Sequence, residues 1–344
     1  MRGKCFFLFV PALLWSVCTG AQITVNDADD GAAVSFASVY NADGTLIGMT
    51  DLNGLLPAQA EHDGPISIYH MNYGSVEVLP DTVHNSRVSI RRNVYMTPGM
   101  PAKSEKKDVA KLSVYVRQYH IADGIPASYQ DGVYDFYFPD GKENARRKIR
   151  YTRSLFRKDI LEDKKALPAF TDPLPDIKRS PDVLTEGILA SINGGSDIEK
   201  KIYKNGSCIG LLRADKQRRI YEAVIDSAYA DLPVKVNVLG VHLRIANAIA
   251  GETFSMTDGN PDIKDLLRKH LYLQNFIRLH GKDNPETKDE QFTEIYVLSA
   301  GYVDKDSMKA DMKADKAADF VMPDGVPALP ASFDKDIGRM VEKD

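Results

Sequence analysis

The run from Gly206 to Gly210, with Cys208 at its centre, is the pattern best suited to covalent chemistry. It has the spacing of a nucleophile elbow with cysteine in place of serine, in which a tight strand-to-helix turn presents the nucleophile to an oxyanion hole. Here Asn205 and Gly206 are typical of a turn between two strands, and no helical pattern follows Leu212. Three histidines downstream could serve as the base: His242, His270 and His280. We interpret Cys208 as a half-buried strand cysteine, with a hydrolase that uses Cys208 as an alternative.

Histidines and acidic turns are the candidate metal ligands. The histidines do not form the His-x-His, His-x-x-Glu or His-x-x-x-His spacings that place two ligands on one face. The acidic turns at residues 27–30 and 51–53 lack the twelve-residue spacing of a calcium loop, so we interpret them as turns closed by their own side chains. We therefore expect no metal, no cofactor and no catalytic residue. The seven histidines are His62, His70, His84, His120, His242, His270 and His280.

A basic segment is the strongest charge feature of the chain. On a strand, Arg146, Lys148 and Arg150 would share one face, with Tyr151 on the opposite side. We interpret the segment as a solvated edge strand whose charge prevents edge-to-edge aggregation. The alternative is contact with anionic lipid head groups or lipopolysaccharide. Its members are Arg146, Arg147, Lys148, Arg150, Arg153, Arg157 and Lys158.

The elements that must position these residues are mostly strands. Short segments of alternating apolar and polar residues fill the first part of the chain, and Asp-Gly and Asn-Gly turn signals separate them. This spacing predicts an antiparallel β-sandwich over residues 22–96. The strand segments are 34–40, 46–49, 66–71, 76–79 and 88–94, and the turns lie at 29–31, 41–44, 51–54 and 63–65.

The same region carries a family resemblance. Residues 32–40, then Gly44, then the corner Thr50-Asp51-Leu52-Asn53-Gly54 together resemble the carboxypeptidase regulatory-like, transthyretin-like domain. The resemblance implies a small β-sandwich accessory module, often found at the N-terminus of bacterial envelope proteins, with no catalytic residues of its own. It does not bring a zinc peptidase site with it.

Beyond residue 96, a second and larger β domain is predicted. Residues 97–110 combine two prolines, a glycine and a charge cluster, which is typical of a linker. From 111 to 344, alternation resumes, and turn signals at 139–141 and 205–206 predict two hairpins. Four prolines make 163–185 an irregular surface segment, while 219–225 and 234–249 are expected to be strands.

Helical signals are few and short. We expect helices at about 261–270, 305–318 and 333–341. Residues 272–280 and 292–303 could form a hairpin, or the first helix could extend to Gly281 as its C-terminal cap; the sequence does not separate these alternatives. The expected fold class is mainly β: an N-terminal antiparallel β-sandwich of transthyretin (prealbumin) type, and a larger antiparallel β domain with two or three peripheral helices.

The N-terminus predicts export. Arg2 and Lys4 precede a mostly apolar run from Cys5 to Val17, and small residues follow at the positions before a cleavage that leaves Gln22 first. Residues 1–21 are therefore expected to be a removable signal peptide, because thirteen residues span only about 20 Å as a helix. A lipoprotein is the minor alternative. After cleavage Cys208 is the one remaining thiol, and we expect no transmembrane helix in the mature chain.

Composition and net charge limit the classes of function that the chain can have. Apolar residues at 43% and charged residues at 27% are typical of a folded protein. Removing Arg2 and Lys4 from the 44 basic residues leaves 42 against 48 acidic ones, a net charge of −6 that disfavours nucleic-acid binding. We expect a non-enzymatic envelope protein of the periplasm or outer membrane that binds a partner protein, a peptide or an amphiphile. The alternatives are a cryptic hydrolase and a structural component of an outer-membrane assembly.

Overall fold

The computed structural model describes most of the chain after the expected signal peptide. The predicted signal peptide, residues 97–108 of the predicted linker and most of the proline-rich segment 163–185 lie outside the described residues. The described residues are 23–57, 64–79, 86–93, 109–159, 177–179, 192–195, 199–226, 234–238, 241–256, 261–279, 285–314 and 322–342.

The N-terminal module, residues 23–93, is a small β-sandwich, as predicted. Four strands form an antiparallel sheet in the order β3-β2-β4-β5, and β1 pairs with β6 in parallel. Val25, Val39, Ile68 and Ile90 are buried between the two sheets. The strands are β1 (Thr24–Asp27), β2 (Ser38–Tyr40), β3 (Leu46–Met49), β4 (Ile66–His70), β5 (Gly74–Val78) and β6 (Arg87–Ile90).

The corner at Asp51 to Gly54 shows why the module turns where the sequence predicts. Asp51 Oδ1 accepts hydrogen bonds from the backbone N–H groups of Asn53 and Leu55, each at 2.8 Å. Gly54 has a φ of +74°, and a Cβ there would lie 2.5 Å from the carbonyl oxygen of Val25. Only glycine fits this position, and the interpretation of this acidic turn as a turn closed by its own side chain is confirmed.

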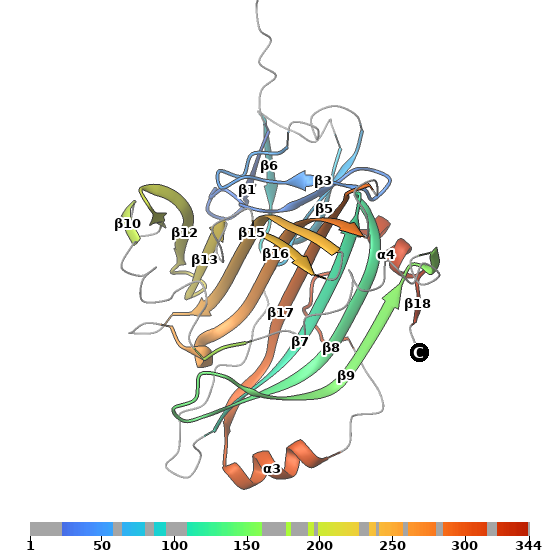
Figure 1. Cartoon of the computed structure of the whole chain (residues 1–344). Coiled ribbons are helices and arrows are strands. Elements are labelled where there is room, and N and C mark those ends of the chain that lie inside the picture. The colour runs from blue at the N-terminus through green and yellow to red at the C-terminus, as the bar shows by residue number, and fades with distance from the viewer. Residues whose placement is uncertain are drawn as a thin grey trace, which may run out of the picture.

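A sheet with twelve strands in the described residues makes up most of the rest of the structure. Its order is β10-β11-β12-β13-β15-β16-β17-β7-β8-β9-β18, with β14 paired to β15, and its pairings are antiparallel. The N-terminal module lies over one end of this curved sheet, and helix α3 lies across the other end (Figure 1). The strands are β7 (Val109–Ala122), β8 (Ile125–Pro139), β9 (Arg146–Phe156), β10 (Ile192–Gly195), β11 (Glu199–Lys204), β12 (Ser207–Asp215), β13 (Ile220–Asp226), β14 (Val234–Val238), β15 (Val241–Ser255), β16 (Leu266–Leu279), β17 (Thr287–Val303) and β18 (Val341–Glu342).

Alternation along the long strands gives the sheet two different faces. Val114 on β7, Phe136 on β8 and Val297 on β17 belong to the largest apolar cluster, on one face. Their neighbours Arg117 and Glu294 lie on the opposite face, where they are also buried. Because successive side chains point to opposite faces, one face forms the apolar core and the other meets the N-terminal module.

The prediction of a helix at about 261–270 is wrong. A capping box between Asp262 and Asp265 supports only a single 3₁₀ turn, Ile263–Asp265, after which Leu266 is extended with ψ at 130°. Strand β16 then runs to Leu279 between β15 and β17. The leucine spacing also fits a helix, but hydrogen-bonded pairing with a strand on each side stabilises the extended conformation more. Of the two alternatives for the following residues, the hairpin is confirmed and the extended helix is wrong.

The other predicted elements need smaller corrections. Residues 234–249 form a hairpin of β14 and β15 instead of one strand, and β7 begins two residues inside the predicted linker. Helix α3 (Lys305–Lys313) starts where predicted, because Asp304 caps the N–H groups of Asp306 and Ser307. Helix α4 (Ala331–Ile337) ends before Val341, which belongs to β18. Within the described part of the chain, the helices are too short to cross a membrane.

Candidate functional site at the junction

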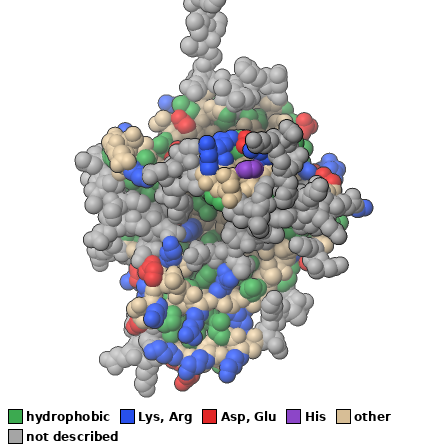
Figure 2. All heavy atoms as spheres, viewed as in Figure 1, with side chains coloured by type: hydrophobic (Ala, Val, Ile, Leu, Met, Phe, Trp, Pro, Cys, Tyr) green, Lys and Arg blue, Asp and Glu red, His purple; other side chains and the backbone are tan. Residues whose placement is uncertain are grey.

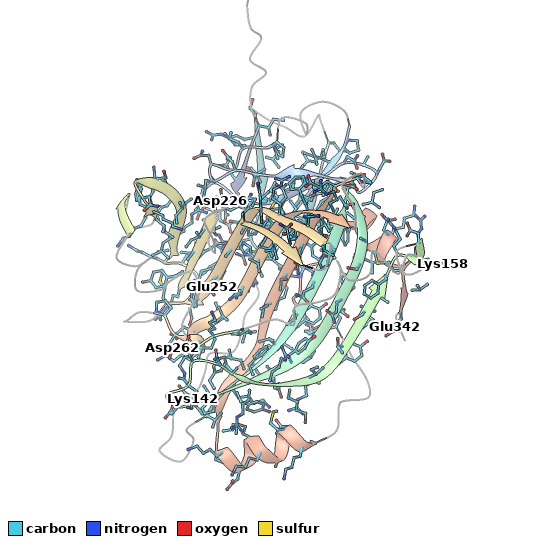
Figure 3. All side chains as sticks on the ribbon, viewed as in Figure 1. Lys142, Lys158, Asp226, Glu252, Asp262 and Glu342 are labelled. Atoms are coloured by element: carbon cyan, nitrogen blue, oxygen red, sulfur yellow. The ribbon has the colours of Figure 1, made fainter. Side chains whose placement is uncertain are left out.

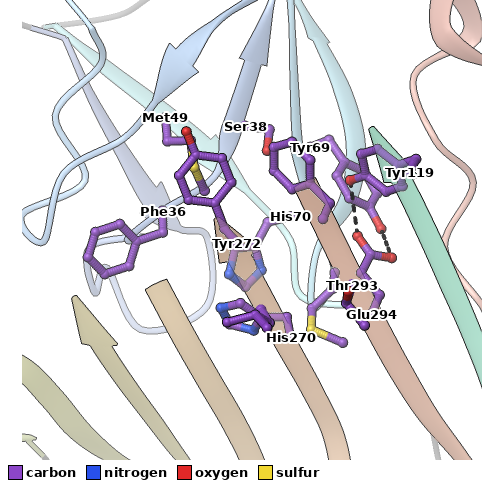
Figure 4. Close-up of a pocket in the computed structure, with 13 residues that line it drawn as sticks. Phe36, Ser38, Met49, Tyr69, His70, Tyr119, His270, Tyr272, Thr293 and Glu294 are labelled. Carbon is purple, nitrogen blue, oxygen red and sulfur yellow. Dashed lines mark hydrogen bonds between the residues drawn. The ribbon is translucent and has the colours of Figure 1, made fainter. Parts of the chain in front are cut away.

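Many buried polar side chains gather where the N-terminal module meets the sheet. We call this region the junction; β2, β3 and β4 face β7, β16 and β17 across it. Figure 4 shows His70 and His270 beside each other in a small cavity, with Tyr69 and Tyr119 bonded to Glu294. The cavity measures about 30 Å³, enough for one or two water molecules but not for an organic ligand.

An arginine–glutamate pair forms the first half of the junction. Arg117 Nε donates to Glu294 Oε2 at 3.0 Å, and both side chains are about 5% exposed or less. Tyr69 and Tyr296 each donate to the same carboxylate oxygen at 2.9 Å, and Tyr119 donates to Oε1 at 3.3 Å. Burial raises the pKa of Tyr69 and of Tyr119 well above 10.0, so both hydroxyls stay protonated and act as donors.

A second buried network joins the module to β13. Arg92 donates to Glu222 Oε2 at 3.0 Å and to the Tyr73 hydroxyl at 2.8 Å. Asn72 donates to the other Glu222 oxygen and accepts from Arg268 at 2.7 Å. Burial opposes ionisation of Glu222, but several neighbouring groups, of which Arg92 has the largest effect, together outweigh it and hold the pKa of Glu222 well below its usual range. The pair therefore remains charged at neutral pH.

Two histidines lie between these networks, His70 buried and His270 partly buried. Their ring centroids are 6.1 Å apart in an edge-on arrangement, and His70 Nδ1 accepts a hydrogen bond from the N–H of Asn72. Burial lowers the pKa of His70 from 6.5 to about 3, and it also lowers the pKa of His270. Both imidazoles are neutral at pH 7. Gly251 leaves room for His270, since an added Cβ would overlap the His270 ring.

Apolar contacts close the junction around these polar groups. Tyr119 and Phe292 stack at 4.8 Å between ring centroids, and Phe333 of α4 packs edge-on against Tyr119 and Tyr40. Module and sheet residues belong to one apolar cluster here. Figure 3 shows the side chains crowded together where the module meets the sheet. This arrangement binds the two parts to each other and offers no accessible nucleophile or base.

The structure places Cys208 away from the junction. It is exposed near the start of β12, just after the hairpin turn at Asn205-Gly206, and β12 continues as a strand instead of a helix. The predicted hairpin is confirmed, but the thiol is exposed and not half-buried. Cys208 does not line the cavity at the junction.

The structure brings together a histidine, an aspartate and a serine, residue types that occur in catalytic triads, which the sequence did not predict to be close. His120 Nδ1 lies 3.2 Å from Asp289 Oδ1, and Ser128 on β8 lies directly opposite His120. Their exposures are 4%, 1% and 6%, so a substrate does not reach them, and we interpret the group as structural. Asp289 comes 169 residues after His120, and only the pairing of β7 with β17 could have revealed the contact.

The basic segment begins on β9, which within the described residues pairs with β8 along its length and with β18 at Leu155 and Phe156. The predicted edge strand is therefore confirmed over most of β9, but its charged side chains are not simply solvated. Lys148 is buried and donates to the carbonyl oxygen of Ala314 at 2.8 Å, and Arg153 makes two hydrogen bonds to Asp131. The register slips by one residue at Arg150, which puts Tyr151 on the face of Lys148 and not opposite it. The segment is bonded to the sheet because β8 and α3 supply buried carboxylates and carbonyls.

Comparisons with known proteins leave the chain without an assigned family. It matches no model of a known protein family, and no curated protein is significantly similar. Three chains of solved structures match, among them one described as showing lipid–protein interactions in lipovitellin. That chain shares 8% sequence identity, with a TM-score of 0.22, over 64% of this chain and 27% of its own length.

Proposed function

We propose that this chain is a non-enzymatic, exported envelope protein with an accessory or binding role, directed at a partner protein, a peptide or an amphiphile. Its N-terminal module would be a carboxypeptidase regulatory-like domain. Export is supported by the signal-like residues 1–21, and the module by its sandwich and its Asp51–Gly54 corner.

The proposal rests on one observation at the junction. Arg117 is bonded to Glu294 and Arg92 to Glu222, and the cavity that Glu294 lines holds only one or two waters. Charged side chains that are buried and paired with each other are not available to a substrate. These pairs therefore favour a rigid structure whose function depends on its surface.

Turnover and processing are the two tests. The purified mature chain, beginning at Gln22, is assayed with fluorogenic ester and peptide substrates beside Cys208→Ser and Ser128→Ala variants. We expect no turnover above the protein-free blank. Turnover that one of these substitutions abolishes would establish a hydrolase and refute the proposal.

The full chain is then expressed with residues 1–21 in a bacterium, and the mature N-terminus is sequenced. Gln22 at the N-terminus and recovery from the periplasm or the outer membrane are expected. An uncleaved chain in the cytosol would contradict export. Extraction only with the outer membrane, as part of a stable complex, would favour the alternative of a structural component.

A further inference from the structure

Exposed cations collect at the end of the sheet that lies farthest from the N-terminal module. Figure 2 shows Lys and Arg side chains over this lower end, where Figure 1 places α3, and Figure 3 places Lys142 there too. This gathering contrasts with the net charge of −4 of the whole chain. We call the set the basic end; its exposed members are Lys142, Arg146, Lys305, Lys309 and Lys313.

The way α3 packs on the sheet explains why its lysines face outward. Met308 is buried against Val109 and Tyr137, and Asp311 accepts from Lys111 at 3.1 Å and from Arg150. These contacts orient one side of the helix towards the sheet. The lysines repeat every four residues and so form a stripe on another side, directed to solvent.

In the part of the chain that the structure describes, fewer exposed acidic residues than exposed cations lie near this stripe. Asp306 pairs with Lys309 at 3.0 Å, but their side chains are 91% and 62% exposed, so water and salt screen the pair. Asp140 and Glu143 lie on the β8–β9 hairpin beside Lys142. Asp311 is bonded to its sheet partners, and Asp304 is a partly exposed residue that caps α3. Among the described residues, five exposed cations therefore face three exposed carboxylates and one partly exposed carboxylate.

The chemistry of the stripe favours a bilayer surface. The three helix cations are lysines, which are flexible point charges that suit diffuse head groups, whereas arginine forks suit paired phosphate contacts. Met312, 37% exposed, lies between Lys309 and Lys313 and provides an apolar side chain at the same surface. We propose that the basic end binds the anionic head groups of a phospholipid bilayer, which deepens and rests on the proposed binding function.

Vesicle flotation tests this directly. The full mature chain is mixed at low ionic strength with vesicles of phosphatidylcholine, with or without phosphatidylglycerol. The chain is expected to float with the anionic vesicles alone and to be released by salt. Lys305→Gln/Lys309→Gln/Lys313→Gln is expected to bind about a hundredfold more weakly, since each lysine contributes about fivefold.

A matched variant controls for net charge and folding. Lys200→Gln/Lys201→Gln/Lys204→Gln removes the same charge from exposed positions on β11, and its binding is expected to change by less than about twofold. Both variants should keep the wild-type circular dichroism and thermal midpoint. Equal weakening by both triples, equal flotation with both vesicles, or no flotation refutes the basic end as a lipid surface.

Two further measurements separate the remaining outcomes. Retention on duplex DNA without flotation would identify nucleic acid as the polyanion and overturn the proposal. Inorganic phosphate should not compete with the vesicles beyond its effect as a salt; specific competition would point to a free-phosphate site. Failure of flotation leaves the proposed non-enzymatic function standing, because that function is refuted only by its own turnover and processing tests.

Discussion

Acidification from neutral pH to about pH 5 should destabilise the folded chain through His70 and His270 of the junction. His70 is enclosed by Glu222, Arg92, Arg268 and His270, and burial lowers its pKa from 6.5 to about 3. Between these two values the unfolded chain binds a proton that the folded chain does not bind. The free energy of unfolding therefore falls as the pH falls through this range.

The size of the loss follows from the shift. One histidine of this kind costs about 1.4 kcal/mol for each pH unit below 6.5, or about 2 kcal/mol at pH 5. His270 acts in the same direction, because burial lowers its pKa too. Glu222 does not interfere, since its lowered pKa keeps its contribution intact above pH 4.5. Burial raises the pKa of Asp265 and of Asp334, which offsets part of the loss towards the lower end of this range.

Urea denaturation at a series of pH values measures this slope. The variant His70→Gln should lose about 2 kcal/mol less than wild type between neutral pH and pH 5, and His70→Gln/His270→Gln should lose least. His242→Gln is the matched control, because His242 lies near the surface and bonds to Asn237 away from the junction. A free energy of unfolding that is independent of pH in wild type, or an unchanged slope in the double variant, would refute the reasoning.

Three other predictions concern the same structure. Arg117→Met leaves the Glu294 carboxylate buried without its cation and should cost about 3–5 kcal/mol of unfolding free energy, with a smaller loss in Arg117→Met/Glu294→Gln, both measured by denaturation. Gly251→Ala places a methyl group against the His270 ring and should cost about 1–3 kcal/mol, whereas Gly301→Ala, where a Cβ meets nothing within 4 Å, should cost much less. Cys208→Ser changes an exposed strand position and should alter stability by less than about 0.5 kcal/mol; a larger loss would mean that the thiol is packed.

The sequence predicted the elements whose signals are local. Asp51 and Gly54 define their corner by side-chain and backbone geometry within five residues, and Asn205-Gly206 does the same for the β11–β12 hairpin. The prediction of a helix after Pro261 was wrong because Leu266 and Leu271 fit a helical spacing. The segment is a strand because it pairs with β15 and β17. Local patterns do not contain that information.

The candidate site could not be predicted from the sequence for the same reason. Arg117 and Glu294 are 177 residues apart, and Arg92 and Glu222 are 130 apart, so no motif joins them. The alternation of residues along the strands also does not show that the module covers one face of the sheet. The bonds that hold Lys148 and Arg153 to the rest of the structure depend on Ala314 and Asp131, which sequence spacing does not bring near.

The contacts at the junction indicate that the module is part of one folded unit with the sheet. A linker-joined accessory domain would present a polar, solvated surface to its neighbour, whereas here Tyr69 and Arg92 bring buried polar groups to a shared apolar cluster. Separation would expose that cluster and leave Glu294 and Glu222 without the partners that the module supplies. Because a buried charge is costly without its partner, the module and the sheet should unfold together. That rigidity leaves the outer surfaces, and the basic end among them, as the parts of the molecule free to meet a partner.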